Sequence, residues 1–368
     1  MRIGIEAQRI FRSKKHGMDI YALELIRQLQ KTDFENEYFI FVKAGPDRCL
    51  EESPNVKIIE VKGATYADWE QVWLPLAVKK HQIDLLHCTS NTAPLLLNTP
   101  LIVTIHDIIY LNQSFSGGSL YQKLGHYYRQ WVVPMVFKKA RKVFTVSEFE
   151  KKHMVEKLGQ AHKIESVYNG VAEKFRPYSE IEKESIKAKF NLPDEYFFFL
   201  GNTAPKKNML GLLKAYKGYT DQIEVPLPLV IAESSREDLN KMLTAIDGLP
   251  LAKHIHLTGY VSHDDLPEIY AAAHCFIYPS LRESFGIPII EAMACGTQVI
   301  TSNTSSMPEV AGGAAKLVDP FSENDIKSAM IDMQFSNGIA AKVATGLARA
   351  AAFTWISTAE KVQANYIA

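Results

Sequence analysis

The chain has 368 residues, of which 47% are hydrophobic, and its 41 Lys and Arg side chains balance 41 Asp and Glu side chains to a formal net charge of zero. This length predicts two domains, and the absence of any run of about 18 apolar residues argues against a membrane-spanning helix. Residues 1–172 carry 23 basic and 18 acidic side chains, and residues 173–368 carry the reverse. This asymmetry is too small to favour nucleic acid as a partner.

Short apolar runs alternate with amphipathic stretches along the first half of the chain. Residues 18–30, for example, place Ile20, Leu23, Ile26 and Leu29 at helical spacing. Apolar runs separated by helices are typical of a parallel sheet that is covered on both faces. The runs predicted to be strands are residues 2–7, 38–42, 56–61, 84–87, 101–105, 142–146 and 164–167.

The same alternation restarts in the second half, where the predicted strands are residues 196–200, 229–232, 254–258, 275–278, 298–301 and 315–318. We therefore predict an α/β protein with two doubly wound, Rossmann-like domains, residues 1–174 and 175–354, which face each other across a cleft. Residues 355–368 are predicted to form a helix that packs back on the first domain. Ligands of such sheets bind beyond the carboxyl ends of the strands, so site residues are expected in the loops that follow strands.

One segment of the second half follows a predicted strand and opens a helix. Pro288 suits the first position of that helix, which leaves the N–H groups of Gly286 and Ile287 without helical partners. Together with the helix dipole they can bind an anion or a hydroxyl group. Glu283 and Glu291 add carboxylates that suit the hydroxyls of a sugar and of a ribose. A helix N-terminus with favourably placed acids explains the same residues without a ligand.

Glu283 and Glu291, with Phe285, Gly286 and Ile287 between them, resemble the signature of the retaining GT-B glycosyltransferases of family four, in particular bacterial polysaccharide mannosyltransferases. Further matches run in the expected order, at residues 104–107, 146–148, 167–171, 201–208, 259–261, 302–303 and 308–310. The resemblance implies the GT-B fold, with the nucleotide-sugar donor in the second domain and the acceptor on the first. It also implies that these five residues bind the donor and that Glu283 is catalytic.

Lys206 and Lys207 follow the first predicted strand of the second domain, and two ammonium groups there suit a diphosphate. A solvated basic turn explains them equally without a ligand. Lys207 matches the family directly, whereas Arg is common at the position of Lys206, which weakens the case for a bidentate phosphate contact there. His106 ends an apolar strand, where a histidine is often structural. The resemblance implies instead that His106 lines the sugar pocket, and we predict catalytic roles for His106 and Lys207.

Three further residues are predicted to contact the donor. Gly17 lies between the first strand and the first helix, where a glycine allows close approach of a ligand, although an ordinary loop is an equal alternative. The family often has a second glycine two positions later, where this chain has Asp19, so phosphate contact from that position is in doubt. Tyr260 and Val261 follow a strand of the second domain, where backbone groups are expected to hold the base.

The sequence lacks the signatures of other nucleotide-dependent enzymes. No Asp-x-Asp pair follows a strand to hold a divalent cation, no Gly-x-Gly-x-x-Gly follows the first strand, and no Walker loop is present. We therefore expect no metal site and no cofactor other than the nucleotide-sugar substrate. GDP-mannose is the favoured donor on the basis of the resemblance alone, with UDP-linked hexoses and amino sugars as alternatives.

These features predict transfer of a hexose, with retention of anomeric configuration, to a glycan or glycolipid acceptor of polysaccharide or lipopolysaccharide synthesis. Two alternatives stay open. One is a nucleotide-sugar 2-epimerase of the same architecture, which would consume donor without an acceptor. The other is a non-catalytic protein that binds a nucleotide sugar without turning it over. The sequence does not indicate an oligomeric state.

Aromatic and basic residues are mixed in residues 119–142, including Tyr121, Tyr127, Trp131 and Lys138. This segment either touches the surface of a membrane or forms a packed amphipathic helix with a solvated basic end. Because no signal-peptide pattern precedes the first strand, we expect a cytoplasmic protein, with peripheral contact to the inner face of the membrane as an option.

Overall fold

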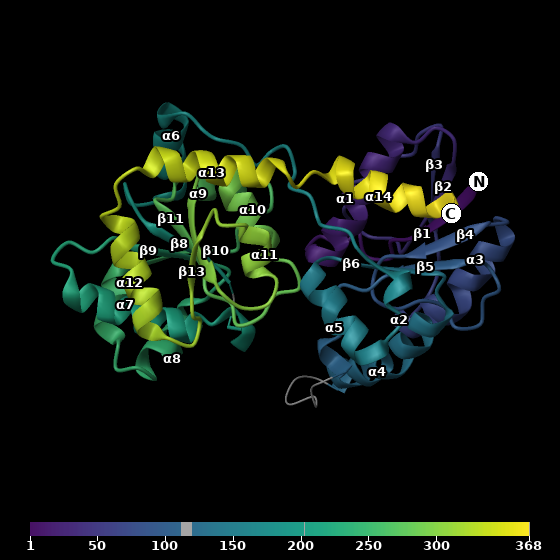
Figure 1. The fold of residues 1–368 in the computed structure, drawn as a ribbon, viewed down its shortest axis with the longest axis horizontal. Coiled ribbons are helices and arrows are strands. Elements are labelled where there is room, and N and C mark those ends of the chain that lie inside the picture. Colours follow the sequence, from purple (N-terminus) through teal and green to yellow (C-terminus); the bar gives the residue numbers. More distant parts are fainter. Residues whose placement is uncertain (112–119, 202, 368) are drawn as a thin grey trace. The chain divides into compact units, whose positions relative to one another are not determined.

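The chain forms two α/β units in the computed structural model, which describes residues 1–111, 120–201 and 203–367, apart from the side chains of residues 120–122 and 367 (Figure 1). Unit 1 comprises Met1–Gly170 with Trp355–Ala368, and unit 2 comprises Val171–Thr354. This division lies four residues before the predicted boundary at residue 174. The reason is that Val171 already belongs to unit 2, where its N–H donates to the carbonyl of Phe353 at 3.0 Å.

Unit 1 is built on a sheet of seven parallel strands, counted over the described residues, in the order β3-β2-β1-β4-β5-β6-β7. The strands are β1 (Arg2–Glu6), β2 (Glu37–Val42), β3 (Val56–Glu60), β4 (Leu85–Cys88), β5 (Leu101–Thr104), β6 (Lys142–Thr145) and β7 (Ile164–Ser166). Each predicted run forms a strand, with ends that differ by one residue at most. Ala7, for example, leaves β1, yet its N–H still donates to the carbonyl of Phe41 at 2.9 Å.

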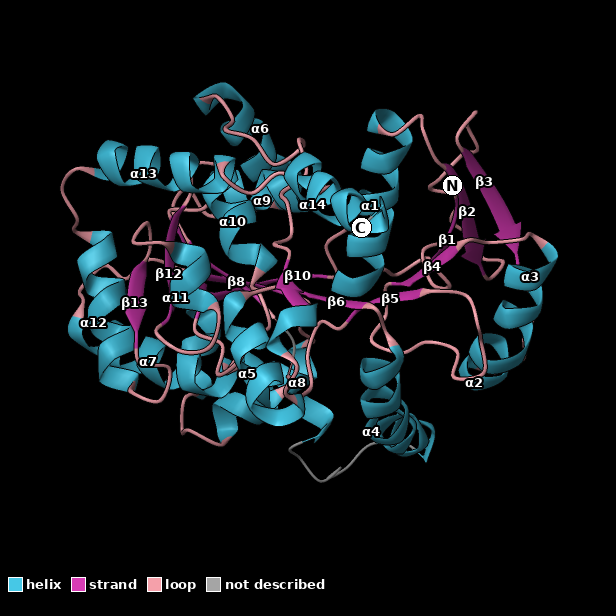
Figure 2. Ribbon diagram, turned by 45° about the vertical axis from the view of Figure 1, so that its right-hand side comes forward, coloured by secondary structure: helices cyan, strands magenta, loops and turns pink. Residues whose placement is uncertain are grey.

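Helices cover both faces of this sheet, as Figure 2 shows. Those of unit 1 are α1 (Gly17–Thr32), α2 (Tyr66–Asp68), the π-helical turn η1 (Trp69–Trp73), α3 (Leu74–Lys80), η2 (Ile109–Leu111), α4 (Leu120–Lys139), α5 (Glu148–Leu158), η3 (Ala161–Lys163) and α14 (Trp355–Ile367). Along β2, Tyr38 and Ile40 pack toward α1 and α14, while Phe39 and Phe41 pack toward α3 and α4. Because both faces are buried, the strand is hydrophobic from Tyr38 to Val42.

The C-terminal helix α14 is part of unit 1 and packs against α1. Trp355, Val362 and Tyr366 join the same core as the apolar face of α1. The hydroxyl of Tyr366 also lies 2.8 Å from Nδ1 of the buried His87. Among the described residues, no helix is both long enough and apolar enough to cross a membrane.

Unit 2 repeats the architecture with six parallel strands, again counted over the described residues, in the order β10-β9-β8-β11-β12-β13. The strands are β8 (Phe197–Leu200), β9 (Leu229–Ala232), β10 (Ile255–Gly259), β11 (Cys275–Tyr278), β12 (Gln298–Ser302) and β13 (Lys316–Val318). The predicted runs of the second half all form strands, and the predicted α/β class with two Rossmann-like domains is confirmed.

The helical segments of unit 2 are α6 (Glu180–Phe190), η4 (Pro205–Lys207), α7 (Met209–Gln222), α8 (Arg236–Thr244), η5 (Leu249–His254), α9 (Leu266–Ala272), α10 (Ile287–Ala294), α11 (Met307–Ala311), α12 (Glu323–Gln334) and α13 (Ile339–Ala351). One face of the sheet packs on α7, α8 and α12. On the other face, Phe198, Tyr270 and Phe276 pack ring against ring, with centroids 4.9–5.7 Å apart. Edge-to-face pairs of this kind stabilise a core beyond the area that they bury.

Each sheet reverses its strand order at one place. In unit 1 the chain moves outward from β1 in one direction and from β4 in the other, and in unit 2 the same happens at β8 and β11. Connections on opposite sides of such a point diverge, which leaves a crevice at the carboxyl ends of the two strands, where ligands of open α/β sheets bind. The loops after β1, β4, β8 and β11 are therefore where polar residues bear on function.

Candidate functional site

The loop after β8 carries the two lysines that the sequence predicted. Lys206 and Lys207 lie in the short turn η4, and the next residue, Asn208, has a left-handed backbone with φ of 60°. The side chain of Asn208 donates to the carbonyls of Pro279 at 3.0 Å and Pro320 at 2.7 Å. The first bond ties the loop after β8 to the loop after β11, across the point where the strand order reverses, and the second reaches the segment after β13.

Glu283 follows β11 and meets both lysines, although it lies 76 positions from Lys207 in the chain. The Nζ of Lys207 donates to Oε1 of Glu283 at 2.9 Å and to the hydroxyl of Tyr278 at 2.7 Å, and that hydroxyl donates to the same carboxylate at 2.9 Å. Lys206 is more distant, with Nζ 3.9 Å from Oε2. The sequence did not single out Tyr278, which a polar group at a strand end could have suggested.

The charges of this cluster are unequal. Burial alone would raise the pKa of Glu283, but the positive charges of Lys207 and Lys206 outweigh burial and lower it. The carboxylate is therefore ionised at neutral pH, and two cations face one anion. The side chain of Lys206 is 54% exposed and that of Lys207 is 20% exposed, so an anion from solvent can reach both and compete with Glu283 for them. The cluster thus provides a site for a multiply charged anion such as a diphosphate.

The N-terminus of α10 lies directly after Glu283 in the chain. Gly286 caps it with φ of 102°, a conformation that favours glycine, and Ile287 begins the helix. The hydroxyl of Ser306 donates to the carbonyls of Glu283 at 2.9 Å and of Phe285 at 2.8 Å, which fixes the loop before the helix. Pro288 has no N–H, and the N–H of Ile289 donates to the carbonyl of Gly286 at 3.0 Å, so the N–H groups left for an anion or a hydroxyl are those of Gly286 and Ile287.

Glu291 lies four residues after Ile287, the first residue of α10, and is 5% exposed. Its Oε1 is 3.4 Å from Nε2 of His263, and the ring of Phe175 packs edge-on against that imidazole at 5.4 Å. Neither His263 nor Phe175 was predicted. Burial, and then the negative charge of Glu283, raise the pKa of Tyr278, with a smaller contribution from the charge of Glu291.

The predicted base-binding residues follow β10. The strand ends at Gly259, whose φ of 69° lets the chain turn, and Tyr260 is 58% exposed while Val261 is half-buried. The carbonyl of Gly259 accepts the N–H of Glu233 at 2.9 Å, and Glu233 itself has a left-handed φ of 61°. The loops after β9 and β10 are therefore adjacent, on the far side of β8 from Glu283.

His106 follows β5 in unit 1 and is 7% exposed. Its backbone N–H donates to Oδ1 of Asn91 at 2.7 Å, and its Nε2 lies 2.9 Å from the carbonyl of Thr89. A carbonyl only accepts, so Nε2 carries the proton. Burial lowers the pKa of His106 to about 4, so the ring is neutral at pH 7. Nδ1 is then the acceptor nitrogen and can take a hydrogen bond from a hydroxyl group.

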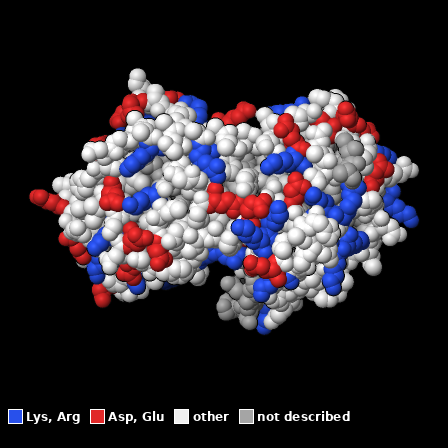
Figure 3. Space-filling view, in the orientation of Figure 1, with Lys and Arg blue, Asp and Glu red and all other residues white. Residues whose placement is uncertain are grey.

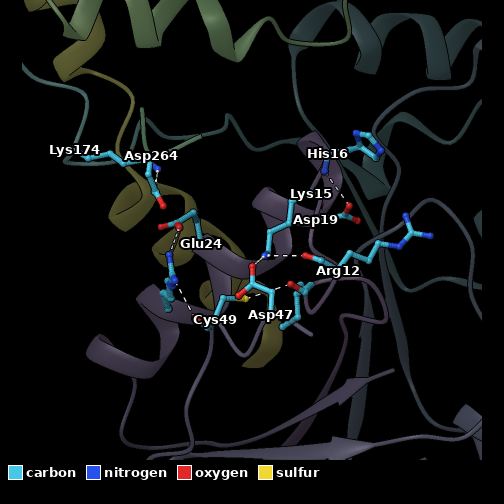
Figure 4. Close-up of polar contacts among 11 residues, drawn as sticks. Arg12, Lys15, His16, Asp19, Glu24, Asp47, Cys49, Lys174 and Asp264 are labelled. Carbon is cyan, nitrogen blue, oxygen red and sulfur yellow. Dashed lines mark hydrogen bonds and ion pairs between the residues drawn. The ribbon is translucent and has the colours of Figure 1, made fainter. Parts of the chain in front are cut away.

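Gly17 opens α1, and a Cβ on it would meet no heavy atom within 4 Å, so packing within the protein does not require a glycine there. Asp19, whose role the sequence left in doubt, is a capping residue. Its carboxylate accepts the N–H of His16 at 3.0 Å (Figure 4). The same carboxylate lies 2.9 Å from Nε of Arg9. Asp19 is 2% exposed, and capping together with this ion pair accounts for a buried carboxylate at this position.

The loop between β1 and α1 is tied to the loop after β2. Lys15 forms an ion pair with Asp47, and its Nζ donates to the carbonyl of Arg12 at 3.2 Å (Figure 4). The thiol of Cys49 donates to the carbonyl of Ile10 at 3.2 Å. These contacts hold the loop that precedes Gly17 and Asp19 in one conformation.

The sequence did not single out Glu6 and Glu70, which are among the buried carboxylates of unit 1. Glu6 ends β1 and Glu70 lies in η1, and each is 1% exposed. A polar residue at the carboxyl end of the first strand could have suggested Glu6, whereas no sequence signal distinguished Glu70. Over the residues that the structure describes, no group of three or more His, Cys, Asp or Glu side chains could hold a metal ion.

Comparison with known proteins places the chain in a family. The model described as Glycosyltransferase Family 4 matches residues 16–175, and the model described as Glycosyl transferases group 1 matches residues 180–337. The O-antigen chain mannosyltransferase RfbU of Salmonella typhimurium is 30% identical over 265 residues, which are 71% of this chain and 69% of that protein. The chain belongs to this glycosyltransferase family.

Further relatives of this family-four chain match over part of their length. The O-antigen chain mannosyltransferase B of Escherichia coli is 33% identical over 220 residues, 59% of this chain and 58% of that protein. In its match to the serotype-specific mannosyltransferase WbdA of Escherichia coli, the chain spans only 28% of the relative. The crystal structure of Anabaena HepE in complex with UDP and glucose has a TM-score of 0.76 at 15% identity, covering 100% of this chain and 99% of that chain. That similarity establishes the GT-B fold.

Proposed function

We propose that this family-four chain is a glycosyltransferase that moves a hexose from a nucleoside diphosphate sugar to a glycan or lipid-linked acceptor. The observation that carries the proposal is the cluster of Lys206, Lys207 and Glu283, which lies where the strand order of unit 2 reverses. In this reaction the bond between the sugar and the diphosphate breaks, so negative charge grows on the leaving phosphate. Two lysines and the first N–H groups of α10 would stabilise that charge in place of a bound cation.

The donor would meet the predicted residues one group at a time. The diphosphate would replace Glu283 as the ion-pair partner of Lys207 and Lys206. The carboxylate of Glu283 could then accept hydrogen bonds from the hydroxyls of the sugar. Glu291 would bind the ribose, since two vicinal hydroxyls suit one carboxylate. Tyr260 and Val261 would hold the base, and Gly17 would leave room for the diphosphate from unit 1. Phe285, Gly286 and Ile287 would line the sugar and phosphate subsite.

His106 would contact the hexose through its acceptor nitrogen. Its neutral ring and its protonated Nε2 leave Nδ1 free to accept a hydroxyl of the sugar. A cationic ring at this place would repel the positive charge that develops on the sugar carbon in the transition state. We further propose retention on one face of the sugar, with a phosphate oxygen taking the proton of the acceptor and no metal ion taking part.

GDP-mannose is our proposed donor, with UDP-linked hexoses and amino sugars as alternatives. The support is that several relatives of at least 30% identity are named as O-antigen or serotype-specific mannosyltransferases. The structural neighbour in complex with UDP and glucose keeps the alternative open. Incubation of the protein with radiolabelled GDP-mannose or UDP-glucose and a mannan-type acceptor tests the proposal. Transfer from neither donor, with no donor binding by calorimetry, would refute it.

The same assay separates the two other functions that the sequence left open. A nucleotide-sugar 2-epimerase would release nucleotide or an epimerised sugar with no acceptor present, whereas a transferase would need the acceptor for sustained turnover. A non-catalytic nucleotide-sugar sensor would bind donor and release neither product. The signature of Glu283 and Glu291 argues against the epimerase, and the presence of Glu283, Lys207 and His106 together argues against a protein that only binds.

The acceptor side includes an apolar surface on α4. Leu124, Tyr127, Trp131 and Met135 recur at helical spacing and are 69%, 53%, 63% and 42% exposed, while the opposite side of α4 is buried in the core. Tyr121, which the sequence grouped with them, has a side chain outside the described residues. Basic and acidic side chains are interspersed over the face drawn in Figure 3, and the formal net charge of the chain is zero. Electrostatic attraction to an anionic membrane would therefore be weak. We propose peripheral contact of α4 with the inner face of the membrane, from a cytoplasmic location.

A further inference from the structure

Residues 89–92, which begin the connection from β4 to β5, form a short loop that holds His106 in place. The carbonyl of Thr89 accepts Nε2–H, and the side chain of Asn91 accepts the backbone N–H of His106. Asn91 has a left-handed φ of 70°, and its own N–H donates to the carbonyl of Thr104 at 3.0 Å. Both contacts to His106 thus depend on the conformation of one short loop.

Glu6 supports the first residue of this loop from β1. Its Oε2 accepts the N–H of Thr89 at 3.2 Å, and its backbone carbonyl accepts the hydroxyl of Thr89 at 2.7 Å. Because β1 and β4 are neighbours in the sheet, the first residue of the loop is anchored to a rigid element. The far end of the loop needs a separate support.

Glu70 supplies that support. Its Oε2 accepts the hydroxyl of Thr92 at 2.5 Å, and its Oε1 accepts the hydroxyl of Tyr128 at 2.5 Å and the side-chain N–H of Gln71 at 2.9 Å. Tyr66 also lies within 2.7 Å of the hydroxyl of Thr92. Three donors converge on one carboxylate, which is a group that only accepts, so the arrangement suits an ionised Glu better than a Gln, whose amide would present N–H groups to a donor.

The backbone of η1 brings Glu70 to this position. Trp69–Trp73 forms a π-helical turn, a rare geometry that inserts an extra residue into a helix and often occurs at functional sites. Trp69 anchors the turn, since it is fully buried and its indole N–H donates to the carbonyl of Val61 at 3.0 Å. Next to Glu70, Gln71 donates to the carbonyl of Ala93 and accepts the N–H of Leu95, which extends the support past the end of the loop.

We propose that Glu70 is a positioning residue of the transfer reaction, which acts with Tyr128 and Thr92 to hold the loop of residues 89–92 and thereby the orientation and tautomer of His106. The inference rests on the sugar-binding role of His106 proposed above. Glu70 itself touches neither substrate nor reacting atoms, because it is 1% exposed and its carboxylate is occupied by the loop and α4.

Because Glu70 can titrate, its support of the loop of residues 89–92 should depend on pH, which packing alone would not cause. Burial raises the pKa of Glu70 to about 7, against the hydrogen bonds from Thr92 and Tyr128 that lower it. The titratable or charged groups around it are Glu6 from β1, Tyr66 from α2, Cys88 from β4 and Tyr128 from α4. Protonation turns one accepting oxygen into a donor, so one of the bonds to Thr92 and Tyr128 weakens as pH falls below 7. We therefore expect kcat to depend on a group that titrates near neutrality.

Three conservative variants test the proposal in the full chain. Tyr128→Phe and Thr92→Val each remove one hydroxyl that donates to Glu70, and Glu70→Gln keeps the volume while changing the acceptor. We expect each to lower kcat about tenfold, and to leave KM for the donor within about twofold, because the donor is held mainly by unit 2. Glu70→Gln should also abolish the titration near pH 7 in the pH profile of kcat.

Tyr110→Phe is the matched control. The hydroxyl of Tyr110 is buried and makes no hydrogen bond within the described residues, so the control removes the same group from the same side of the sheet without touching the loop. We expect its kcat to stay within about twofold of the wild type. Circular dichroism melting verifies that the variants compared are folded.

A second readout needs no substrate. In ¹⁵N-histidine-labelled protein, the ring signals of His106, assigned by their absence in His106→Asn, report which nitrogen is protonated. We expect the pure Nε2–H form in the wild type and in Tyr110→Phe, and a mixture of tautomers in Glu70→Gln and Tyr128→Phe. Unchanged tautomer and unchanged kcat in folded variants would overturn the proposal. If the wild type transfers no sugar, the proposed function fails, while the tautomer still decides whether Glu70 positions His106.

Discussion

The two units share one architecture, yet the polar residues that follow their strands differ in charge and in how they are held. In unit 1, His106 is neutral and buried and is held by hydrogen bonds to a loop that buried carboxylates support. In unit 2, Glu283 and Lys207 are charged and form an ion pair near the surface. The difference indicates two kinds of ligand group, since uncharged acceptors at fixed angles suit the hydroxyls of a sugar, whereas unequal charges suit phosphates.

The physical cause lies in what covers each crevice. In unit 1 the turn η1 and the loop after β4 exclude water, so burial lowers the pKa of His106 and raises that of Glu70. In unit 2, Lys206 reaches solvent and the lysine charges dominate over burial, so Glu283 stays ionised. The predictions that follow test this contrast, from the largest expected effect to the smallest.

Removal of the charge at Glu283 should have the largest effect. Glu283→Gln keeps the volume but loses the carboxylate that would face the sugar, and we expect kcat to fall about 10²-fold, the scale for losing one preorganised polar contact. Affinity for the nucleoside diphosphate should stay equal or increase, because Lys207 is no longer paired. Steady-state kinetics with calorimetry measure both quantities. An unchanged kcat would show that the ion pair is only structural.

Acid should destabilise unit 1 through its buried histidines. Burial lowers the pKa of His87 to about 3 and that of His106 to about 4, whereas an unfolded histidine titrates near 6.5. As pH decreases through 6.5, the unfolded chain binds protons that the native unit does not. The free energy of unfolding therefore falls, by about 2 kcal/mol for each histidine at pH 5. All four tryptophans belong to unit 1, so their fluorescence reports this unit during denaturant titrations at pH 7, 6 and 5.

Glu70 should oppose this trend. Its raised pKa means that the native unit binds a proton more tightly than the unfolded chain does, so its contribution to stability is present below pH 4.5 and is lost as pH rises through 7. Glu70→Gln should consequently steepen the loss of stability between pH 7 and pH 5. A free energy of unfolding that does not change over this range in either protein would contradict the neutral, buried state of His87 and His106.

Glu291 should affect binding more than rate. A contact to the ribose is the same in the ground and transition states, so Glu291→Gln should raise KM for the donor about tenfold, or about 1.4 kcal/mol, and leave kcat within about threefold. Glu184→Gln, which removes an exposed carboxylate of α6 that pairs with Lys187, is the matched control for charge. Loss of kcat at normal donor affinity would exchange the roles of Glu291 and Glu283.

The apolar face of α4 should give a modest, salt-sensitive membrane affinity. Trp131→Ser and Tyr127→Ser remove exposed rings without opening the core, and we expect each to reduce co-sedimentation with anionic vesicles at low salt about threefold, or about 0.7 kcal/mol. Val225→Ser, at an exposed apolar residue of unit 2, is the control. Equal binding of wild type and variants to neutral and anionic vesicles would reject the proposed contact.

Chelation should have the smallest effect. Because two lysines and a helix N-terminus would balance the charge of the diphosphate, transfer should persist in the presence of EDTA at an unchanged rate. Activity assays with EDTA, followed by addition of Mg²⁺ or Mn²⁺, decide the matter. A loss of activity that either cation restores would mean that the charge balance in unit 2 needs a metal ion.

The amino-acid sequence by itself determined the strands of the part of the chain that the structure describes, because parallel strands covered by helices read as short apolar runs whose position hardly depends on their neighbours. It also singled out Glu283, Lys207 and His106 as polar residues that directly follow strands. The roles of these residues remain predictions, since their positions alone do not test them.

Only the tertiary structure decided which of these residues meet. The strand order brings Lys207 and Glu283 to 2.9 Å of each other across 76 positions, and local patterns carry no information about strand order. Asp19 occupies a position where the family often has a glycine, and the sequence left its role in doubt. In the structure its carboxylate caps α1 and forms an ion pair with Arg9. No sequence signal distinguished Glu70. One π-helical turn directs it inward, and hydroxyls from distant elements make its burial possible, because a carboxylate is stable inside a protein only where donors from the rest of the fold converge on it.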